Sequence, residues 1–160
     1  HRPQDQGFEE TFLWKDVSSR FNPGVELNGT EVRMEGFLDD LIFDEAIAFI
    51  QRQGEEPFFC YVASFLPHDF PGKKQIPEDE ITPYAQAGHL TRGDLESYAM
   101  ITRMDRNIGR LLTALEVSGR ADNTIVVFLS DNGPQQRHAL VSFAGRGKSA
   151  QGATLWNAHP

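Results

Sequence analysis

The sequence predicts an α/β fold with a mostly parallel sheet and helices on both of its faces. Two apolar runs, residues 57–65 and 124–130, have the composition of strands that are buried on both faces. Residues 36–53 and 94–118 instead repeat their apolar side chains with a helical period. Because helix, strand, long loop, helix and strand follow one another, the chain is predicted to contain a β-α-β crossover, the unit that builds parallel sheets.

Residues 1–35 are rich in proline and glycine and are predicted to contain a hairpin. Asn28-Gly29 lies between short apolar stretches and is a favoured two-residue turn between antiparallel strands. Asn28-Gly29-Thr30 also matches a glycosylation acceptor. The turn is the preferred interpretation, because turn chemistry explains both the asparagine and the glycine.

The two predicted helices differ in their polar residues. The first has Asp39, Asp40 and Asp44 in its amino-terminal half, where the helix dipole favours negative charge. We interpret them as a solvated face, and an acidic metal cluster is the alternative. The second helix is predicted to pack through a stripe that Asp105 interrupts, made of Leu95, Tyr98, Ile101, Ile108, Leu112 and Leu115.

Composition and charge exclude several classes of protein. The chain of 160 residues is long enough for one domain with its own core. Its net charge of −8, without a stripe of lysine and arginine, argues against a nucleic-acid partner. No apolar run approaches the roughly 20 residues that span a bilayer. The single cysteine, Cys60, lies in an apolar run and is expected to be a small buried residue rather than a nucleophile.

Polar residues follow both predicted strands and form the candidate site. Asp131 and Asn132 end the second strand and offer the hard oxygen ligands that a divalent cation prefers. His68 follows the first strand. If the strands are parallel, all three lie at one edge of the sheet, where such folds place their chemistry. The alternatives are that Asp131-Asn132-Gly133 is only a turn, and that His68 is only a surface histidine in a loop.

Two motifs carry a resemblance to a known family. They are P-F-F-C-Y-V-A-S-F-L-P-H at residues 57–68 and D-N-T-I-V-V-F-L-S-D-N-G at residues 122–133. Together with weaker matches such as R-P-Q-D-Q-G-F-E-E at residues 2–10, they cover most of residues 1–136. In this order and at this separation the chain resembles the middle of a type I sulfatase, a metal-dependent hydrolase of the alkaline-phosphatase-like superfamily.

The resemblance implies roles for four residues. Asp131 and Asn132 are expected to bind a divalent ion, usually Ca²⁺ in the family. His68 is expected to contact the sulfate group and to help protonate the departing alcohol. Lys148, in G-R-G-K, is the nearest match to a family lysine that neutralises a sulfate oxygen. The implied partner is a sulfated small molecule or glycan, and the implied compartment is periplasmic, secreted or lysosomal.

The chain also departs from the family pattern. The formylglycine motif C/S-x-P-x-R is absent, since Ser18-Ser19-Arg20 lacks its proline and spacing, so the nucleophile is expected outside this chain. Residues 1–160 are therefore expected to form part of a catalytic domain that is inactive alone, with residues 137–160 divergent or unassigned. A phosphoesterase or phosphonate hydrolase of the same superfamily and a non-catalytic remnant or binding module are the alternatives.

Overall fold

The computed structural model describes residues 2–15, 19–68, 76–86 and 88–131. Its sheet has three antiparallel strands in the order β1-β2-β3. These strands are Phe12–Trp14, Gly24–Leu27 and Thr30–Arg33, and a short 3-10 helix, η1, precedes them at Pro3–Gln6. The strands therefore occupy the amino-terminal part of the chain, where the sequence predicts loops and one hairpin.

The predicted hairpin is confirmed. Strands β2 and β3 pair with Leu27 opposite Thr30, which leaves Asn28 and Gly29 as the two turn residues. Both have positive φ angles, 50° and 85°, as the tight turns that match strand twist require. The side-chain oxygen of Asn28 also accepts a hydrogen bond of 2.7 Å from the Thr11 amide, which ties the turn to the residue before β1.

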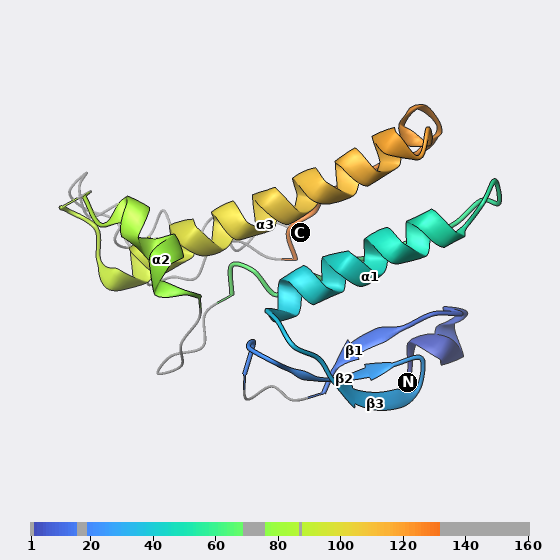
Figure 1. Cartoon of the computed structure of the whole chain (residues 1–160), viewed down its shortest axis with the longest axis horizontal. Helices are drawn as coiled ribbons and strands as arrows, with labels where there is room; N and C mark the ends of the chain where they lie inside the picture. Colours follow the sequence, from blue (N-terminus) through green and yellow to red (C-terminus); the bar gives the residue numbers. More distant parts are fainter. Residues whose placement is uncertain (1, 16–18, 69–75, 87, 132–160) are drawn as a thin grey trace.

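The two long helices are also confirmed. Helix α1 spans Leu38–Arg52 and α3 spans Arg92–Val117. Helix α3 begins with a capping box in which Thr91 and Asp94 each accept from the other's amide. Figure 1 shows α1 between the sheet and α3, with both helices running in the same direction. The shorter elements are α2 at Glu78–Ile81 and the 3-10 helices η2 at Thr82–Tyr84 and η3 at Ala121–Asn123.

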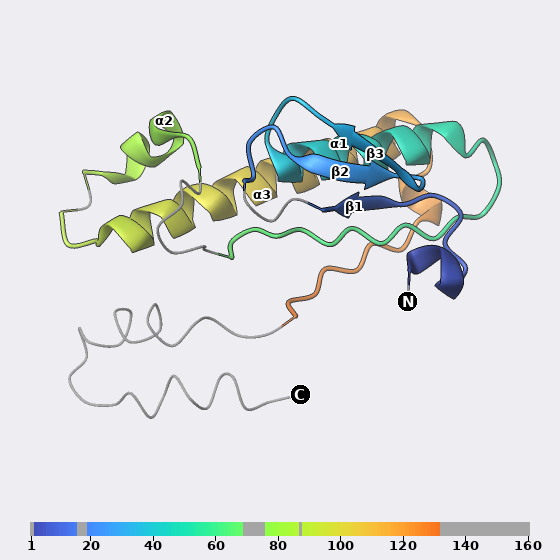
Figure 2. The ribbon, with the colours of Figure 1, turned by 90° about the horizontal axis from the view of Figure 1, so that it is seen from below.

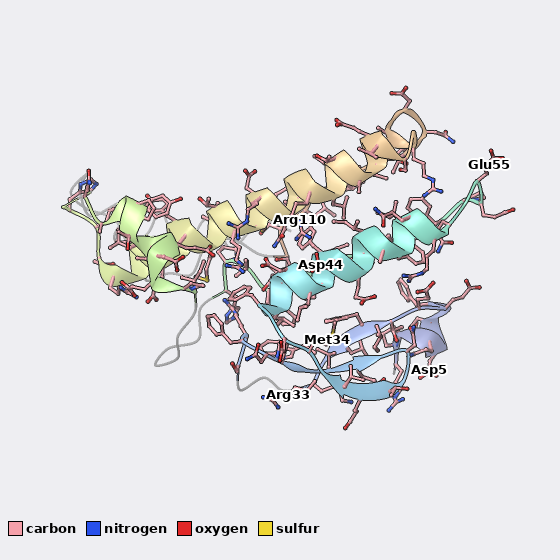
Figure 3. The ribbon with its side chains drawn as sticks, viewed as in Figure 1. Asp5, Arg33, Met34, Asp44, Glu55 and Arg110 are labelled. Atoms are coloured by element: carbon pink, nitrogen blue, oxygen red, sulfur yellow. The ribbon has the colours of Figure 1, made fainter. Side chains whose placement is uncertain are left out.

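Ionic contacts join the amino-terminal half of α1 to α3. Asp44 of α1 and Arg110 of α3 point toward each other and form an ion pair (Figure 3). One turn closer to the amino terminus, Arg103 of α3 donates to Asp40 of α1 and also pairs with Glu80 of α2. These contacts fix the two helices beside each other at the end where the core lies.

The core lies where the amino-terminal halves of α1 and α3 meet the segment before α2. Its buried members are Phe37, Leu66, Ile76, Ile81, Ala99 and Met100.

None of the helices in the described residues combines the length and the apolar composition that a membrane span requires.

Helix α3 packs through a different face from the predicted one. Its buried residues are Ala99, Met100, Arg103, Asn107 and Leu115. The predicted stripe is largely exposed at Tyr98, Ile101 and Leu112. Because α1 and α2 supply charged partners, α3 turns a partly polar face toward them. Of the predicted stripe, Leu115 is buried and Leu95 packs against the core, so its ends contribute to packing.

The expectation that residues 57–65 and 124–130 are buried strands is wrong for the described residues. Both segments are extended, yet neither is paired as a strand. Phe59 is 73% exposed and Ile125 is 92% exposed. An apolar sequence favours extended backbone, whereas burial needs neighbouring strands, and within residues 2–15, 19–68, 76–86 and 88–131 the only sheet is the antiparallel one.

The two segments nevertheless share one direction. Residues 57–68 return from the carboxyl end of α1 toward its amino end, and residues 124–131 leave the carboxyl end of α3 in the same sense (Figures 1 and 2). The crossover predicted from the sequence therefore exists as a path of the chain, although its strands are unpaired in the described residues.

Candidate active site

The predicted site residues lie at the carboxyl ends of the two extended segments. His68 and Asp131 are both exposed. Asn132 and Lys148 lie outside the described residues, so their predicted roles stay predictions. Since the segments run in the same direction, their carboxyl ends point toward the same end of the molecule (Figure 2). The meeting of His68 with Asp131 and Asn132 at one edge also stays a prediction.

The backbone that carries His68 is held by hydrogen bonds from inside the protein. The His68 amide donates to the Phe65 carbonyl at 2.9 Å, which closes a turn. The Arg20 guanidinium donates to the carbonyl of Phe65 at 3.4 Å and to the carbonyl of His68. One buried cation therefore binds both ends of the turn that presents the histidine.

Asp39, at the start of α1, holds the residues just before that turn. One carboxylate oxygen, Oδ1, accepts from the Ser64 hydroxyl at 2.7 Å and from the Phe65 amide at 2.9 Å. The prediction that Asp39 belongs to a solvated face is wrong, because its exposed fraction is 0%. Asp39 lies in phase with the buried residues Phe43 and Ala46 of α1 and therefore faces the interior.

Burial shifts the pKa of both residues. It lowers the pKa of Arg20, although attraction to Asp39 opposes this. It raises the pKa of Asp39, against the effects of hydrogen bonds from Ser64 and Phe65 and of the Arg20 charge. Arg20 is 3% exposed, so it acts on the backbone of the turn and not on solvent. We define Arg20, Asp39, Ser64 and the main chain of Phe65 and His68 as the Arg20–Asp39 cluster.

Two large side chains support this cluster. Met100 of α3 accepts a hydrogen bond at its sulfur from Arg20, with a distance of 3.2 Å. The ring of Phe65 packs edge-on against Trp14 of β1, with 4.8 Å between the ring centroids. The turn before His68 is thus in contact with the sheet and with both long helices.

The described residues hold no ready-made metal site. Among them, no group of three or more histidine, cysteine, aspartate or glutamate side chains could bind an ion. The alternative that the acidic residues of α1 form a metal cluster is therefore not supported within residues 38–52. Cys60 is half-buried, and burial raises the pKa of its thiol, which disfavours the reactive thiolate.

Comparison with known proteins decides the family. The sequence model of the Sulfatase family matches residues 2–158. The chain belongs to the sulfatase family. The resemblance carried by residues 57–68 and 122–133 is therefore confirmed at family level.

Several curated sulfatases are similar to this chain over much of its length. The chain is 30% identical to the uncharacterized sulfatase YdeN of Escherichia coli, over 82% of this chain and 24% of that protein. It is 30% identical to human arylsulfatase A, over 82% of this chain and 22% of that protein. The chain is 35% identical to an N-acetylgalactosamine-6-O-sulfatase of Bacteroides thetaiotaomicron, over 59% of this chain and 16% of that protein. The chain thus spans about a quarter or less of these relatives.

A solved structure has a similar fold. It is Ps i-CgsB in complex with k-i-k-neocarrahexaose, which aligns with a TM-score of 0.75 and 24% identity, over 86% of this chain and 35% of that chain. Together with the family match, this similarity identifies the chain as part of an alkaline-phosphatase-like α/β domain. The antiparallel sheet and the two long helices belong to that domain.

Sequence interpretation missed Arg20 and Asp39. For Asp39 a signal exists, since it precedes Phe43, Ala46 and Ile50 by four, seven and eleven residues, the spacing of one buried helix face. For Arg20 no local signal exists. Its acceptors Phe65 and His68 are 45 and 48 residues away along the chain, and only the fold brings them together.

Proposed function

We propose that this chain is part of a sulfuric ester hydrolase. In this proposal His68 contacts the sulfate group of the substrate, and Asp131 and Asn132 are ligands of a divalent ion, Ca²⁺ in the first instance. The observation that carries the proposal is the family match over residues 2–158, which includes both motifs. The common direction of the two extended segments supports it, because their carboxyl ends point the same way.

The donor chemistry fits a calcium ion only in part. The carboxylate of Asp131 and the amide oxygen of Asn132 are hard ligands of the kind that Ca²⁺ prefers. Calcium takes about six to eight oxygen ligands, so further ligands are needed beyond these two. When bound, such an ion would offset negative charge on the sulfate oxygens. We therefore expect the isolated chain to bind Ca²⁺ only weakly.

The proposed role of His68 is proton transfer. Its exposed position and the fixed turn beneath it suit a group that must meet a substrate from solvent. A protonated imidazole donates its proton to the oxygen of the departing alcohol, which leaves as a neutral molecule. Lys148 is the candidate for a further positive charge at the sulfate. The nucleophile, a formylglycine, is expected outside this chain.

The relatives favour a sulfate ester over the alternatives. The three relatives described above are named as sulfatases, which weighs against a phosphoesterase or phosphonate hydrolase. Names such as N-acetylgalactosamine-6-O-sulfatase and N-sulphoglucosamine sulphohydrolase, and the oligosaccharide bound to Ps i-CgsB, support a sulfated glycan as the substrate class, with a sulfated small molecule as the second choice. The compartment that the resemblance implies, periplasmic, secreted or lysosomal, stays a prediction.

The test uses a sulfatase-active protein that contains this chain and an aryl sulfate as substrate. Replacing a group that transfers a proton typically costs about 10²- to 10⁴-fold in rate, so His68→Asn is expected to lower kcat by that order. His89→Asn is the matched control, since His89 is also exposed but lies in neither motif. Unchanged activity in His68→Asn would refute the proposed role.

A second measurement addresses the ion and the remnant alternative. Calcium titration of the 160-residue chain is expected to give weak binding that Asp131→Ala abolishes. No binding even at millimolar calcium would favour a remnant. Turnover of the aryl sulfate by the isolated chain would contradict the expectation that its nucleophile lies elsewhere.

A further inference from the structure

The Arg20–Asp39 cluster places two buried charges beneath an exposed loop. Arg20 is 3% exposed and Asp39 is 0% exposed, and each is surrounded by the core or by the turn before His68. Taking a charge out of water is costly, and buried ion pairs commonly stabilise a fold no better than apolar side chains of the same size. Stability alone is therefore a weak explanation for both residues.

Their hydrogen bonds point to a more specific role. Asp39 binds the Ser64 hydroxyl and the Phe65 amide, and Arg20 binds the carbonyls of Phe65 and His68. The two charges thus hold the backbone on both sides of the turn, although neither is near it along the chain. A planar guanidinium suits this task because its fork of donors reaches two carbonyl oxygens at once.

We propose that Arg20 and Asp39 are positioning residues that hold the Ser64–His68 turn, and through it the imidazole of His68, in the orientation needed for catalysis. The inference rests on the proposed function, since it assigns a purpose to the geometry of His68. Both residues are buried, so neither is expected to touch the substrate. Each acts through main-chain atoms of the turn.

The chain offers a matched comparison at the next residue. Asp40 follows Asp39 on α1 and also accepts from an arginine and an amide, but its partners Arg103 and Asn107 lie on α3. In the described part of the chain, the side chain of Asp40 forms its hydrogen bonds with these two residues of α3 and not with residues 64–68. Asp40→Ala therefore removes a comparable carboxylate without touching the turn.

The experiment measures aryl sulfate hydrolysis by a sulfatase-active protein containing this chain, at a temperature where every variant is folded by circular dichroism. A misplacement of about 1 Å can cost about 100-fold in rate, so Asp39→Ala is expected to lower kcat by about 10- to 100-fold. The KM should change much less. Asp40→Ala should leave kcat near that of the unaltered protein.

Conservative variants separate positioning from a general loss of stability. Asp39→Asn keeps an acceptor oxygen for Ser64 and Phe65 and should restore most of the activity lost in Asp39→Ala. Arg20→Lys keeps a charge but loses the two-pronged geometry, so its kcat should stay low. If Asp39→Ala does not fold, Ser64→Ala, which removes one hydroxyl, takes its place with a smaller loss of the same kind.

A spectroscopic measurement reports on the turn directly. Nuclear magnetic resonance of the same sulfatase-active protein follows the His68 ring and the Phe65 amide. Asp39→Ala should increase the mobility of both and Asp40→Ala should leave both unchanged.

The outcomes distinguish the inference from the proposed function. If His68→Asn abolishes activity while Asp39→Ala and Asp40→Ala have equal effects, the positioning role is wrong and the proposed function stands. If His68→Asn has no effect, the role of His68 fails and the inference fails with it. A selective loss in Asp39→Ala, with rescue by Asp39→Asn, supports the inference.

Discussion

Asp39 and Asp40 are neighbours on the first turn of α1, yet they serve different parts of the molecule. Asp39 is fully buried and holds the main chain of the turn before His68. The Asp40 side chain is 28% exposed and binds side chains of α3. Successive helical residues point about 100° apart, so one step along the helix separates a carboxylate that orders a loop from one that joins two helices.

The same contrast appears in their ionisation. Burial raises the pKa of Asp39 above its ordinary value. Burial also acts to raise the pKa of Asp40, but hydrogen bonds from Arg103 and Asn107 outweigh it and leave that pKa lowered. Asp39 serves the loop as a hydrogen-bond acceptor in surroundings that disfavour its charge. The surroundings of Asp40 instead stabilise a negative charge.

The largest expected effect comes from replacing the buried guanidinium of Arg20. Arg20→Met leaves Asp39 buried without its opposite charge and frees two carbonyls of the turn. Leaving a buried charge without compensation costs about 3–5 kcal/mol, and we expect a loss of that size in the free energy of unfolding at pH 7. Urea denaturation measures it.

A matched control uses the same substitution on the surface. Arg33→Met changes an exposed arginine of β3 and should stay within about 0.5 kcal/mol of the unaltered chain. If Arg20→Met and Arg33→Met lose the same free energy of unfolding, the buried arginine contributes no more to stability than the exposed one, and the prediction is wrong.

The second effect concerns the half-buried cluster between α1, α2 and α3. The Arg103 side chain is 9% exposed, but its partners Asp40 and Glu80 are 28% and 22% exposed, so water can reach them once the arginine is gone. Arg103→Met also loses the contact of its guanidinium with the Phe37 ring, 4.1 Å from the ring centroid. Hydrogen bonds to charged groups contribute about 1.5–3 kcal/mol, and a loss in this range is expected by urea denaturation. A loss above that of Arg20→Met would reverse the proposed order.

The opposite pKa changes predict opposite effects of pH. Since the folded pKa of Asp39 is raised, its contribution to stability is present below about pH 4 and is lost as the pH rises through the folded pKa. The contribution of Asp40 is present above about pH 4 and is lost as the pH falls through its lowered folded pKa. Each proton contributes a slope of at most about 1.4 kcal/mol per pH unit.

Urea midpoints between pH 3 and pH 7 test this prediction. Asp39→Asn should remove a contribution to the free energy of unfolding that falls as the pH rises. Asp40→Asn should remove a contribution that grows as the pH rises. If both variants shift the pH profile in the same direction, the contrast between the two neighbouring carboxylates is wrong.

Local features of the fold were predictable from the sequence. Asn28-Gly29 encodes its turn through two residues that tolerate positive φ, and the periodicity of α1 and α3 marks both helices. The failures concern partners that are distant in the sequence. Whether residues 124–130 are buried depends on neighbouring strands, and the face that α3 buries depends on charged residues of α1 and α2.

The candidate site divides in the same way. His68 and Asp131 are candidates from the sequence because they follow apolar runs within motifs that resemble a family, and their roles stay predictions. The Arg20–Asp39 cluster was missed, because an acidic residue at a helix start has an adequate explanation in the helix dipole. Only its phase with Phe43, Ala46 and Ile50 argues otherwise. A buried polar contact between distant segments leaves little trace in a single sequence.

The smallest effect is expected at the most exposed ionic contact, which calibrates the other two. Arg92 pairs with Glu78 at 2.6 Å, with side chains 54% and 66% exposed, and hydrogen bonds to Glu78 and Glu96 raise the pKa of Arg92. Water screens this pair, so Glu78→Gln should cost no more than about 0.5 kcal/mol by urea denaturation. Near 1 M salt the screening length is about 3 Å, and the difference should vanish. A loss as large as that of Arg103→Met would mean that the number of ionic hydrogen bonds, and not burial, ranks these clusters.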